Sequence, residues 1–394
     1  MRAFQYYIKT DVVFGAGTVS RVAELVKKHG GSRVLVVYGG GSARRSGLLE
    51  RVFGELDAAL IPYASVGGVQ PNPRLELARE GVRQALDFGA DLILAIGGGS
   101  VIDTAKAIAH GRANPDTDIW EFWKQRAALE RSTPVGVVLT IPAAGSETSD
   151  SAVLTNEAEH EKRGLNTDLN RPAFAILDPE LACTLPQRQL SCGVTDSLMH
   201  TLDRYFTPAD DNELTDELAE ALLRVVIRNG PKVVEDPRDL HAMSEIMWCG
   251  SVSHNGLTGL GAMKEFTTHQ LGHAISEKFD AIHGESLSVM WGSWARYVCG
   301  TKPSRFARYA RNVWGVDDVD DDEAAVLGIE ATENFFRSLH MPVSLGELPG
   351  VGIQTDPGLE ELADRCSYRK SRTIGSFRVL GYAQMLDIYR LANH

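Results

Sequence analysis

The sequence predicts an α/β domain in the N-terminal half of the chain and an all-helical domain in the C-terminal half. In the first half, short apolar runs end in glycine or small hydroxylic residues, and amphipathic stretches follow them. This order is typical of βαβ units around a mostly parallel sheet. After about Gln187, apolar residues recur every three or four positions and β-branched runs are sparse, which indicates helices.

The strands and helices of the first half follow from these runs. Short runs of apolar, β-branched residues are typical of strands that are buried on both faces. The expected strands are residues 33–38, 59–64, 91–96 and 135–140, and the expected helices are residues 44–57, 74–88 and 101–110. An Asp-Pro and a Leu-Pro pair within residues 179–186 then interrupt the chain. We therefore expect two domains, residues 1–186 and residues 187–394.

The composition argues against several classes of protein. The 394 residues carry a formal net charge of −12, whereas a nucleic-acid surface needs a basic face to meet phosphates. No apolar run reaches the roughly 20 residues that span a membrane, and the N-terminus lacks a signal-peptide pattern. The five cysteines form no CxxC pair, which fits a reducing compartment. We expect a cytoplasmic protein without nucleic-acid or membrane partners.

Three strand ends have a composition suited to binding phosphate groups. They are YGGGS at 38–42, GGGSVIDTAK at 97–106 and TIPAAGSE at 140–147. Glycine allows close approach to the backbone, and a helix N-terminus favours negative charge. Carboxyl ends of parallel strands meet at one sheet edge, where open α/β sheets bind ligands. We expect a nucleotide site there, although each turn alone is also explained as a tight turn and none matches the GxGxxG fingerprint.

Two details of these turns bear on the nucleotide. Asp103 lies near a helix start, where it either stabilises the helix dipole or contacts a ligand. After the strand at 33–38, an acidic residue would hold a ribose 2′-hydroxyl and repel a 2′-phosphate. The chain has glycines, a serine and two arginines instead: Gly39, Gly40, Gly41, Ser42, Arg44 and Arg45. This favours NADP(H) over NAD(H), although a solvated helix start also explains the arginines.

Two pairs of side chains in the second half have the spacing of one helix face. Asp196 and His200 are four residues apart, and so are His269 and His273. Residues four apart project from the same side of a helix. Together with His283 on a third segment, they offer one carboxylate and several imidazoles, a set that binds Fe²⁺, Zn²⁺, Ni²⁺ or Mn²⁺. Any one of these histidines alone is more simply explained as structural.

The separation of His269 and His283 sets a structural condition for such a metal site. On one straight helix these residues would lie about 21 Å apart, too far to bind one ion. The chain must therefore turn back between them, and residues 278–281 offer a loop. We expect a new helix to begin at His283, with Gly284 leaving space beside it.

Five stretches of the sequence carry a recognisable pattern. They are YGGGSARRSG (38–47), GGGSVIDTAK (97–106), TIPAAGSE (140–147), FAILDPELACTLPQRQLSCGVTDSLMH (174–200) and THQLGHAISEKFDAIHGESLSV (268–289). The chain thereby resembles the iron-containing (group III) alcohol dehydrogenases, in particular the branch of NADPH-dependent butanol dehydrogenases and aldehyde reductases. The resemblance implies a dehydroquinate synthase-like architecture, with an α/β dinucleotide-binding domain and an all-α metal-binding domain. It also implies hydride transfer between NADP(H) and a small alcohol or aldehyde.

The resemblance further assigns roles to individual residues. Divalent metal ligands would be Asp196, His200, His269 and His283, with Fe²⁺ as the usual ion of the family. His273 matches the histidine near the nicotinamide that is often proposed to relay protons. The residues expected to bind the cofactor are Gly39, Gly40, Gly41, Ser42, Gly98, Gly99, Ser100, Asp103, Thr140, Ala144, Ser146 and Lys162.

The sequence also departs from the family pattern. Ala144 lacks a hydroxyl that the family loop often has, and residues 365–381 replace an FGNN-like segment that we expect to border the substrate site. The aromatic stretch at 119–125 is explained equally by that site and by ordinary packing. The alternatives are a glycerol dehydrogenase-like or dehydroquinate synthase-like reaction on the same architecture, or a non-catalytic nucleotide-binding protein. The family is often dimeric, so we expect a homodimer.

Overall fold

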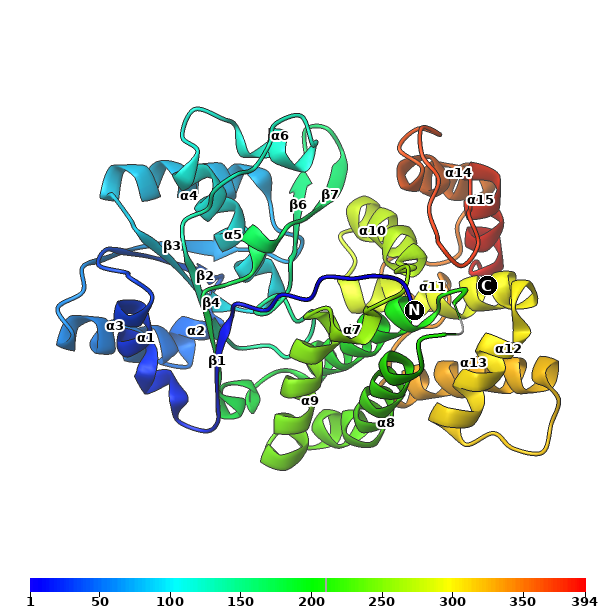
Figure 1. Ribbon diagram of the computed structural model, residues 1–394. Coiled ribbons are helices and arrows are strands. Elements are labelled where there is room, and N and C mark those ends of the chain that lie inside the picture. The colour runs from blue at the N-terminus through cyan, green and yellow to red at the C-terminus, as the bar shows by residue number, and fades with distance from the viewer. Residues whose placement is uncertain (210) are drawn as a thin grey trace. The chain divides into compact units, whose positions relative to one another are not determined.

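The computed structural model describes residues 1–209 and 211–394, which divide into two compact units (Figure 1). One unit is Tyr7–Leu185, and the other combines Met1–Tyr6 with Pro186–His394. The first six residues thus belong with the helical unit, because Arg2 donates its backbone N–H to the carbonyl of Gly261. Within the described ranges, no helix is long and apolar enough to cross a membrane.

A six-stranded parallel sheet organises the first unit. Its order is β1-β8-β5-β4-β2-β3, and every neighbouring pair is parallel. The strands are β1 (Asp11–Phe14), β2 (Val34–Gly39), β3 (Tyr63–Val69), β4 (Leu92–Gly97), β5 (Val135–Leu139) and β8 (Phe174–Leu177). The central strands β4 and β5 are buried along their whole length, as expected for a sheet covered on both faces. A separate antiparallel hairpin joins β6 (Ser151–Asn156) to β7 (Glu161–Asn166).

Helices cover both faces of this sheet (Figure 1). They are α1 (Val22–Lys28), α2 (Ser42–Arg45), α3 (Leu48–Ala58), α4 (Leu75–Phe88), α5 (Gly99–Ala113) and α6 (Ile119–Trp123). Apolar side chains of α1 and α3 form one core with Val34 and Val36 of β2. A second core joins α4, α5, α6 and β6 and contains Trp120 and Trp123. The aromatic stretch at 119–125 therefore serves packing.

Two expectations for the first unit need correction. The strand expected at 59–64 lies at Tyr63–Val69, because the chain still turns after α3 and Leu60 has a φ of 58°. The helix expected at 44–57 is divided into α2 and α3 by Gly47, whose φ of 73° is not helical. The strands β1 and β8 and the hairpin β6–β7 were not expected, since their sequences are short or rich in polar residues.

The second unit is helical, as the periodicity predicts. Its α-helices are α7 (Gln187–Tyr205), α8 (Glu213–Glu235), α9 (Leu240–His254), α10 (Thr267–Phe279), α11 (His283–Val298), α12 (Pro303–Tyr309), α13 (Asp321–Ser338), α14 (Asp356–Cys366) and α15 (Tyr382–Leu391). Aromatic rings fill its centre: Phe206 stacks on Phe306 at 4.4 Å and contacts Trp294 edge-on. The chain turns back between α10 and α11, and α11 begins at His283, which fulfils the condition set for a metal site.

Close packing of α4, α5 and α6 depends on Gly111 in α5. A Cβ at this position would lie 2.4 Å from Cγ2 of Val82 and 2.7 Å from Cγ2 of Ile119. We predict that Gly111→Ala lowers the free energy of unfolding by about 1–3 kcal/mol, because both neighbours are stiff, β-branched side chains. Urea denaturation followed by circular dichroism measures this change.

Gly54 in α3 is the matched control, since it also lies inside a helix and a Cβ there meets nothing within 4 Å. Gly54→Ala is expected to raise the free energy of unfolding by about 0.5–1 kcal/mol, the ordinary gain of helix propensity. Equal and favourable effects of the two substitutions would contradict the close packing at Gly111.

Candidate metal and nucleotide sites

Three helices of the second unit bring the expected metal ligands together. Asp196 and His200 project from one face of α7, His269 lies in the first turn of α10, and His283 is the first residue of α11. The i, i+4 spacing on α7 places its two side chains side by side. The loop between α10 and α11 then returns His283 to the same point.

The carboxylate of Asp196 is the centre of this arrangement. Its Oδ1 lies 3.3 Å from Nε2 of His200 and 3.8 Å from Nε2 of both His269 and His283. Ligand atoms about 2.1 Å from a tetrahedral ion are about 3.4 Å apart, close to these separations. Asp196, His200 and His269 form a group whose ligand atoms all lie within 4.8 Å of one another. This tight group does not include His283.

Burial and hydrogen bonding of these atoms fit a bound cation. Asp196, His200 and His269 are each about 5% exposed or less. Oδ1 of Asp196 and Nε2 of His269 are buried and have no hydrogen-bond partner among the described residues. Buried polar atoms are rarely left without partners, and an ion at this point would satisfy both. Burial also lowers the pKa of His200 well below its usual value, which favours the neutral imidazole that binds metals.

An outer carboxylate orients His269. Nδ1 of this ring lies 2.6 Å from Oδ2 of Asp203, one helical turn after His200 on α7. A hydrogen bond from Nδ1 to the carboxylate leaves Nε2 as the lone-pair nitrogen directed at Asp196. Burial acts to lower the pKa of His269, but the carboxylates of Asp203 and Asp196 outweigh it and raise the pKa. Asp203 lies three residues beyond the motif that ends at His200, and only the fold shows that it contacts His269.

Two further rings flank the ligands. His254 of α9 stacks on His200 with ring centroids 4.0 Å apart. His273, one turn after His269 on α10, has its ring centroid 5.3 Å from that of His283. His273 is partly exposed, in contrast to the buried His269, so it lies at the solvent side of the cluster.

The three glycine-containing turns of the first unit follow neighbouring strands. β2, β4 and β5 are adjacent in the sheet and all parallel, so their carboxyl ends lie at one edge. The backbone N–H of Thr140 donates to the carbonyl of Gly97, which ties the turn after β5 to the turn after β4. The N-cap residue of α5 is Gly98, which has no side chain to cap the helix that begins at Gly99. The arrangement leaves a helix N-terminus suited to phosphate at this edge.

Asp103 and Ser146 are linked in this region. The hydroxyl of Ser146 donates to Oδ1 of Asp103 at 2.6 Å, and the backbone N–H of Val153 donates to Oδ2 at 2.9 Å. Asp103 therefore joins α5 to the turn after β5 and to β6. This role differs from simple stabilisation of the helix dipole. Burial raises the pKa of Asp103 against the opposing effect of nearby Lys106.

Lys106 is a buried cation that the sequence reasoning did not single out. Its Nζ donates to Oγ of Ser146 at 2.8 Å and to the carbonyl of Ser151 at 2.6 Å. The side chain is fully buried, and burial lowers its pKa to about 8. Lys106 thus holds the 146–151 loop against α5. In the sequence, only its place in the GGGSVIDTAK motif marks this lysine, because nothing else about a lysine on an apolar helix face indicates such a role.

The remaining residues expected to bind the cofactor lie around the same turns. Nζ of Lys162 on β7 donates to Oδ1 of Asn72 at 2.9 Å. Gly40 and Ser42 are exposed, and β2 ends at Gly39, which offers no acidic side chain. Nη2 of Arg44 donates to the hydroxyl of Tyr38 at 2.9 Å. Ala144 lies beside Gly99, whose Cβ position is 3.5 Å from the alanine methyl.

Comparison with known proteins gives the class of this protein. Residues 9–179 match iron-containing alcohol dehydrogenase, and residues 191–393 match the C-terminal part of the Fe-containing alcohol dehydrogenase family. The chain is 36% identical over 392 residues to NADH-dependent butanol dehydrogenase A of Clostridium acetobutylicum, with 99% of both chains covered. It is 32% identical over 349 residues to the NADPH-dependent aldehyde reductase YqhD of Escherichia coli, with 88% of this chain and 89% of the relative covered.

A solved structure gives the same result. The crystal structure of NADH-dependent butanol dehydrogenase A from Thermotoga maritima matches with a TM-score of 0.95 at 31% identity, covering 100% of this chain and 99% of that one. The protein is thus an oxidoreductase of the class that interconverts alcohols and aldehydes. More narrowly, the chain belongs to the iron-containing alcohol dehydrogenase family. The family and the fold class expected from the sequence are confirmed.

The contact between Asp203 and His269 leads to a prediction for metal binding. Asp203→Asn weakens the hydrogen bond that orients the imidazole, so the affinity for a divalent ion should fall about 10- to 100-fold. Titration of metal-free protein with Zn²⁺ in competition with a chelating dye measures this change. Asp216→Asn is the control and should leave the affinity unchanged, because it alters a buried carboxylate of α8 that pairs with Arg305 of α12. A normal affinity in Asp203→Asn would contradict the role given to Asp203.

Proposed function

We propose that this protein is a metal-dependent, NADP(H)-linked alcohol dehydrogenase and aldehyde reductase that acts on small substrates. The observation that carries the proposal is the convergence of three imidazoles on the carboxylate of Asp196. The proposed metal ligands are Asp196, His200, His269 and His283. Fe²⁺ is the ion that the family name indicates, and the same ligands also accept Zn²⁺, Ni²⁺ or Mn²⁺.

The ligand set suits stabilisation of an oxygen that gains negative charge. A divalent ion held there would supply Lewis-acid polarisation of the substrate oxygen. One carboxylate and neutral imidazoles leave about one positive charge at the site, which favours an alkoxide over a neutral alcohol. The buried surroundings of His200 and His269 exclude water and strengthen this interaction.

We assign His273 to proton transfer. Its ring lies next to that of His283 but is more exposed than the rings of His200 and His269, so it has access to both the site and solvent. The imidazole would give a proton to the substrate oxygen in reduction and take one in oxidation, directly or through water. The nicotinamide of the cofactor supplies or accepts the hydride.

The turns after β2, β4 and β5 are the proposed cofactor site, with Lys162 at its edge. Gly39 at the end of β2 offers no carboxylate to a ribose 2′-hydroxyl, and Arg44 and Arg45 follow within one short helix. These residues favour a 2′-phosphate and thus NADP(H). The relatives include proteins named for NADH and others named for NADPH, so the preference rests on these residues.

The segment at 365–381 is the proposed border of the substrate site. Its backbone N–H groups at Ser376 and Phe377 donate to Oε2 of Glu265, immediately before α10. Sγ of Cys366 contacts the carbonyl of Gln270 on α10 at 3.5 Å. The segment therefore packs against the helix that carries His269 and His273. Its difference from the usual family sequence is expected to set the range of aldehydes accepted.

We further propose a cytoplasmic homodimer. β1 is an edge strand, and among the described strands it pairs with β8 alone. Phe14 of β1 and Tyr7 and Ile8 just before it are exposed apolar side chains. Exposed edge strands with apolar neighbours readily pair with another chain. None of the five cysteines is in a disulfide, in keeping with a reducing compartment.

The proposed reaction is tested by NADPH-dependent reduction of butyraldehyde, followed by loss of NADPH absorbance. Metal-stripped protein should be inactive and should regain turnover with Fe²⁺, Zn²⁺, Ni²⁺ or Mn²⁺, since the ion polarises the carbonyl. Asp196→Ala should abolish turnover with every ion. Nucleotide binding without turnover across several aldehydes and alcohols would instead favour a glycerol dehydrogenase-like or dehydroquinate synthase-like reaction, or a non-catalytic protein.

The cofactor preference is tested at Gly39. A Cβ at this position would lie 3.6 Å from the carbonyl oxygen of Val69 and 3.8 Å from Cγ2 of Val101, so a side chain fits. Gly39→Asp should lower kcat/KM for NADPH about tenfold relative to NADH, because the carboxylate repels a 2′-phosphate, a difference of about 1.4 kcal/mol. Gly39→Asn is the uncharged control of equal size. A wild-type enzyme that prefers NADH would contradict the proposed preference.

A further inference from the structure

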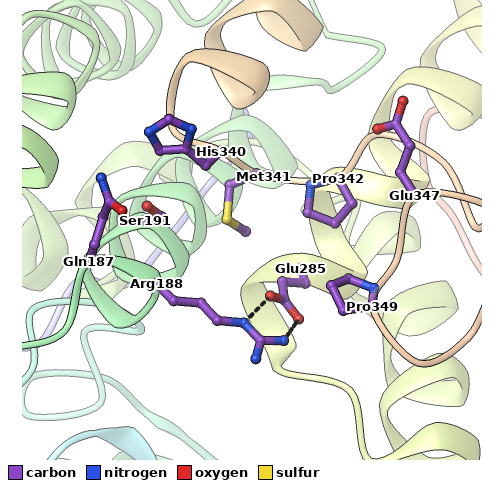
Figure 2. Close-up of a pocket in the computed structure, with 9 residues that line it drawn as sticks. All are labelled: Gln187, Arg188, Ser191, Glu285, His340, Met341, Pro342, Glu347 and Pro349. Carbon is purple, nitrogen blue, oxygen red and sulfur yellow. Dashed lines mark hydrogen bonds and ion pairs between the residues drawn. The ribbon is translucent and has the colours of Figure 1, made fainter.

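An ion pair joins two of the helices that carry the proposed metal ligands. Nε of Arg188 on α7 lies 2.5 Å from Oε1 of Glu285 on α11, and Nη2 lies 2.8 Å from Oε2. Figure 2 shows this two-bond contact at the side of a pocket lined by α7, α11 and the loop after α13. Two parallel N–H···O bonds fix both the distance and the orientation of the two side chains.

The carboxylate partner of this pair is buried. The side chain of Glu285 is 4% exposed, whereas that of Arg188 is 55% exposed. A buried carboxylate that loses its cationic partner is strongly disfavoured and tends to move toward water. Arg188 therefore holds the carboxylate of Glu285 in its present buried position. Loss of the arginine would favour movement of the first turn of α11.

The same turn of α11 carries His283. Glu285 is two residues after His283, and Gly284 between them touches the backbone of α7, where its Cβ position is 2.6 Å from the carbonyl oxygen of Cys192. Cys192 is one helical turn before Asp196. The contact and the ion pair thus hold the first turn of α11 against the segment of α7 that presents Asp196. His283 is outside the tight ligand group and lies in this attached turn.

The pocket beside the ion pair gives small ions access to it. Its volume is about 440 Å³, and its lining includes Ser191, Met341 and Pro342 in addition to the ion pair. Figure 2 places Arg188 and Glu285 together at this opening, with the guanidinium beside the free space. A cavity of this size admits a guanidinium ion with its hydration water.

We propose that Arg188 and Glu285 are positioning residues that fix His283 relative to Asp196 and so set the affinity and geometry of the metal site. This inference rests on the proposed metal ligands. In this role the two side chains contact neither cofactor nor substrate. They act through the first turn of α11. Its removal should change metal binding even in the absence of aldehyde and NADPH.

The experiment is titration of metal-free protein with Co²⁺, whose visible spectrum reports the number and geometry of its ligands. Arg188→Met should weaken Co²⁺ binding about tenfold and shift the spectrum, because His283 is no longer held at ligand distance. Arg188→Lys, which keeps the charge but loses the two-bond contact, should lie between Arg188→Met and the wild type. In Arg188→Ala, millimolar guanidinium should restore part of the affinity, whereas sodium at the same ionic strength should not.

Arg296→Met is the matched control. Arg296 makes the same kind of two-bond contact with Glu333, from the other end of the same helix α11 to α13. Its loss should lower thermal stability about as much as Arg188→Met and leave the Co²⁺ spectrum unchanged. Equal Co²⁺ affinities and spectra for Arg188→Met and wild type would overturn the inference. A wild type that binds no Co²⁺ would instead refute the metal site on which it rests.

Discussion

The carboxylate of Asp196 is the point on which the C-terminal unit is organised. Three imidazoles from α7, α10 and α11 surround one oxygen, and that oxygen has no hydrogen-bond partner among the described residues. Such a buried group is costly unless a cation satisfies it. The i, i+4 spacing on α7, the loop after α10 and the start of α11 at His283 all serve this convergence. The contact with Asp203 then fixes the direction of the His269 ring. The pair Arg188–Glu285 is proposed to hold the helix turn that carries His283.

The first unit solves a related problem with a cation in place of a carboxylate. Lys106 is fully buried, and hydroxyl and carbonyl oxygens of the 146–151 loop surround its Nζ. The hydroxyl of Ser146 also donates to Asp103, so one small polar network joins α5 to the turn after β5. A network whose members all have partners makes the loop rigid. A rigid loop at the carboxyl ends of β4 and β5 is well suited to hold a nicotinamide nucleotide.

The sequence was sufficient for those features that depend on periodicity and local spacing. It predicted the parallel sheet, the helical second half and the turn between His269 and His283, because alternation, helical spacing and ligand distance leave few other solutions. It misplaced β3 and joined α2 to α3, since the conformations of Leu60 and Gly47 are set by local turns that composition does not specify. It missed Lys106, the contact of Asp203 with His269 and the pair Arg188–Glu285. These depend on which helices meet in three dimensions. The roles of the proposed metal ligands and cofactor-binding residues stay predictions.

The central claim is that Asp196, His200, His269 and His283 bind one divalent ion. The most direct measurement is anomalous X-ray scattering from crystals of the protein grown with Co²⁺. We expect one strong anomalous peak at about 2.0–2.2 Å from the carboxylate of Asp196 and from the three imidazoles, as in other sites of this ligand type. A crystal with no anomalous peak at these residues, or with the ion held elsewhere, would contradict it.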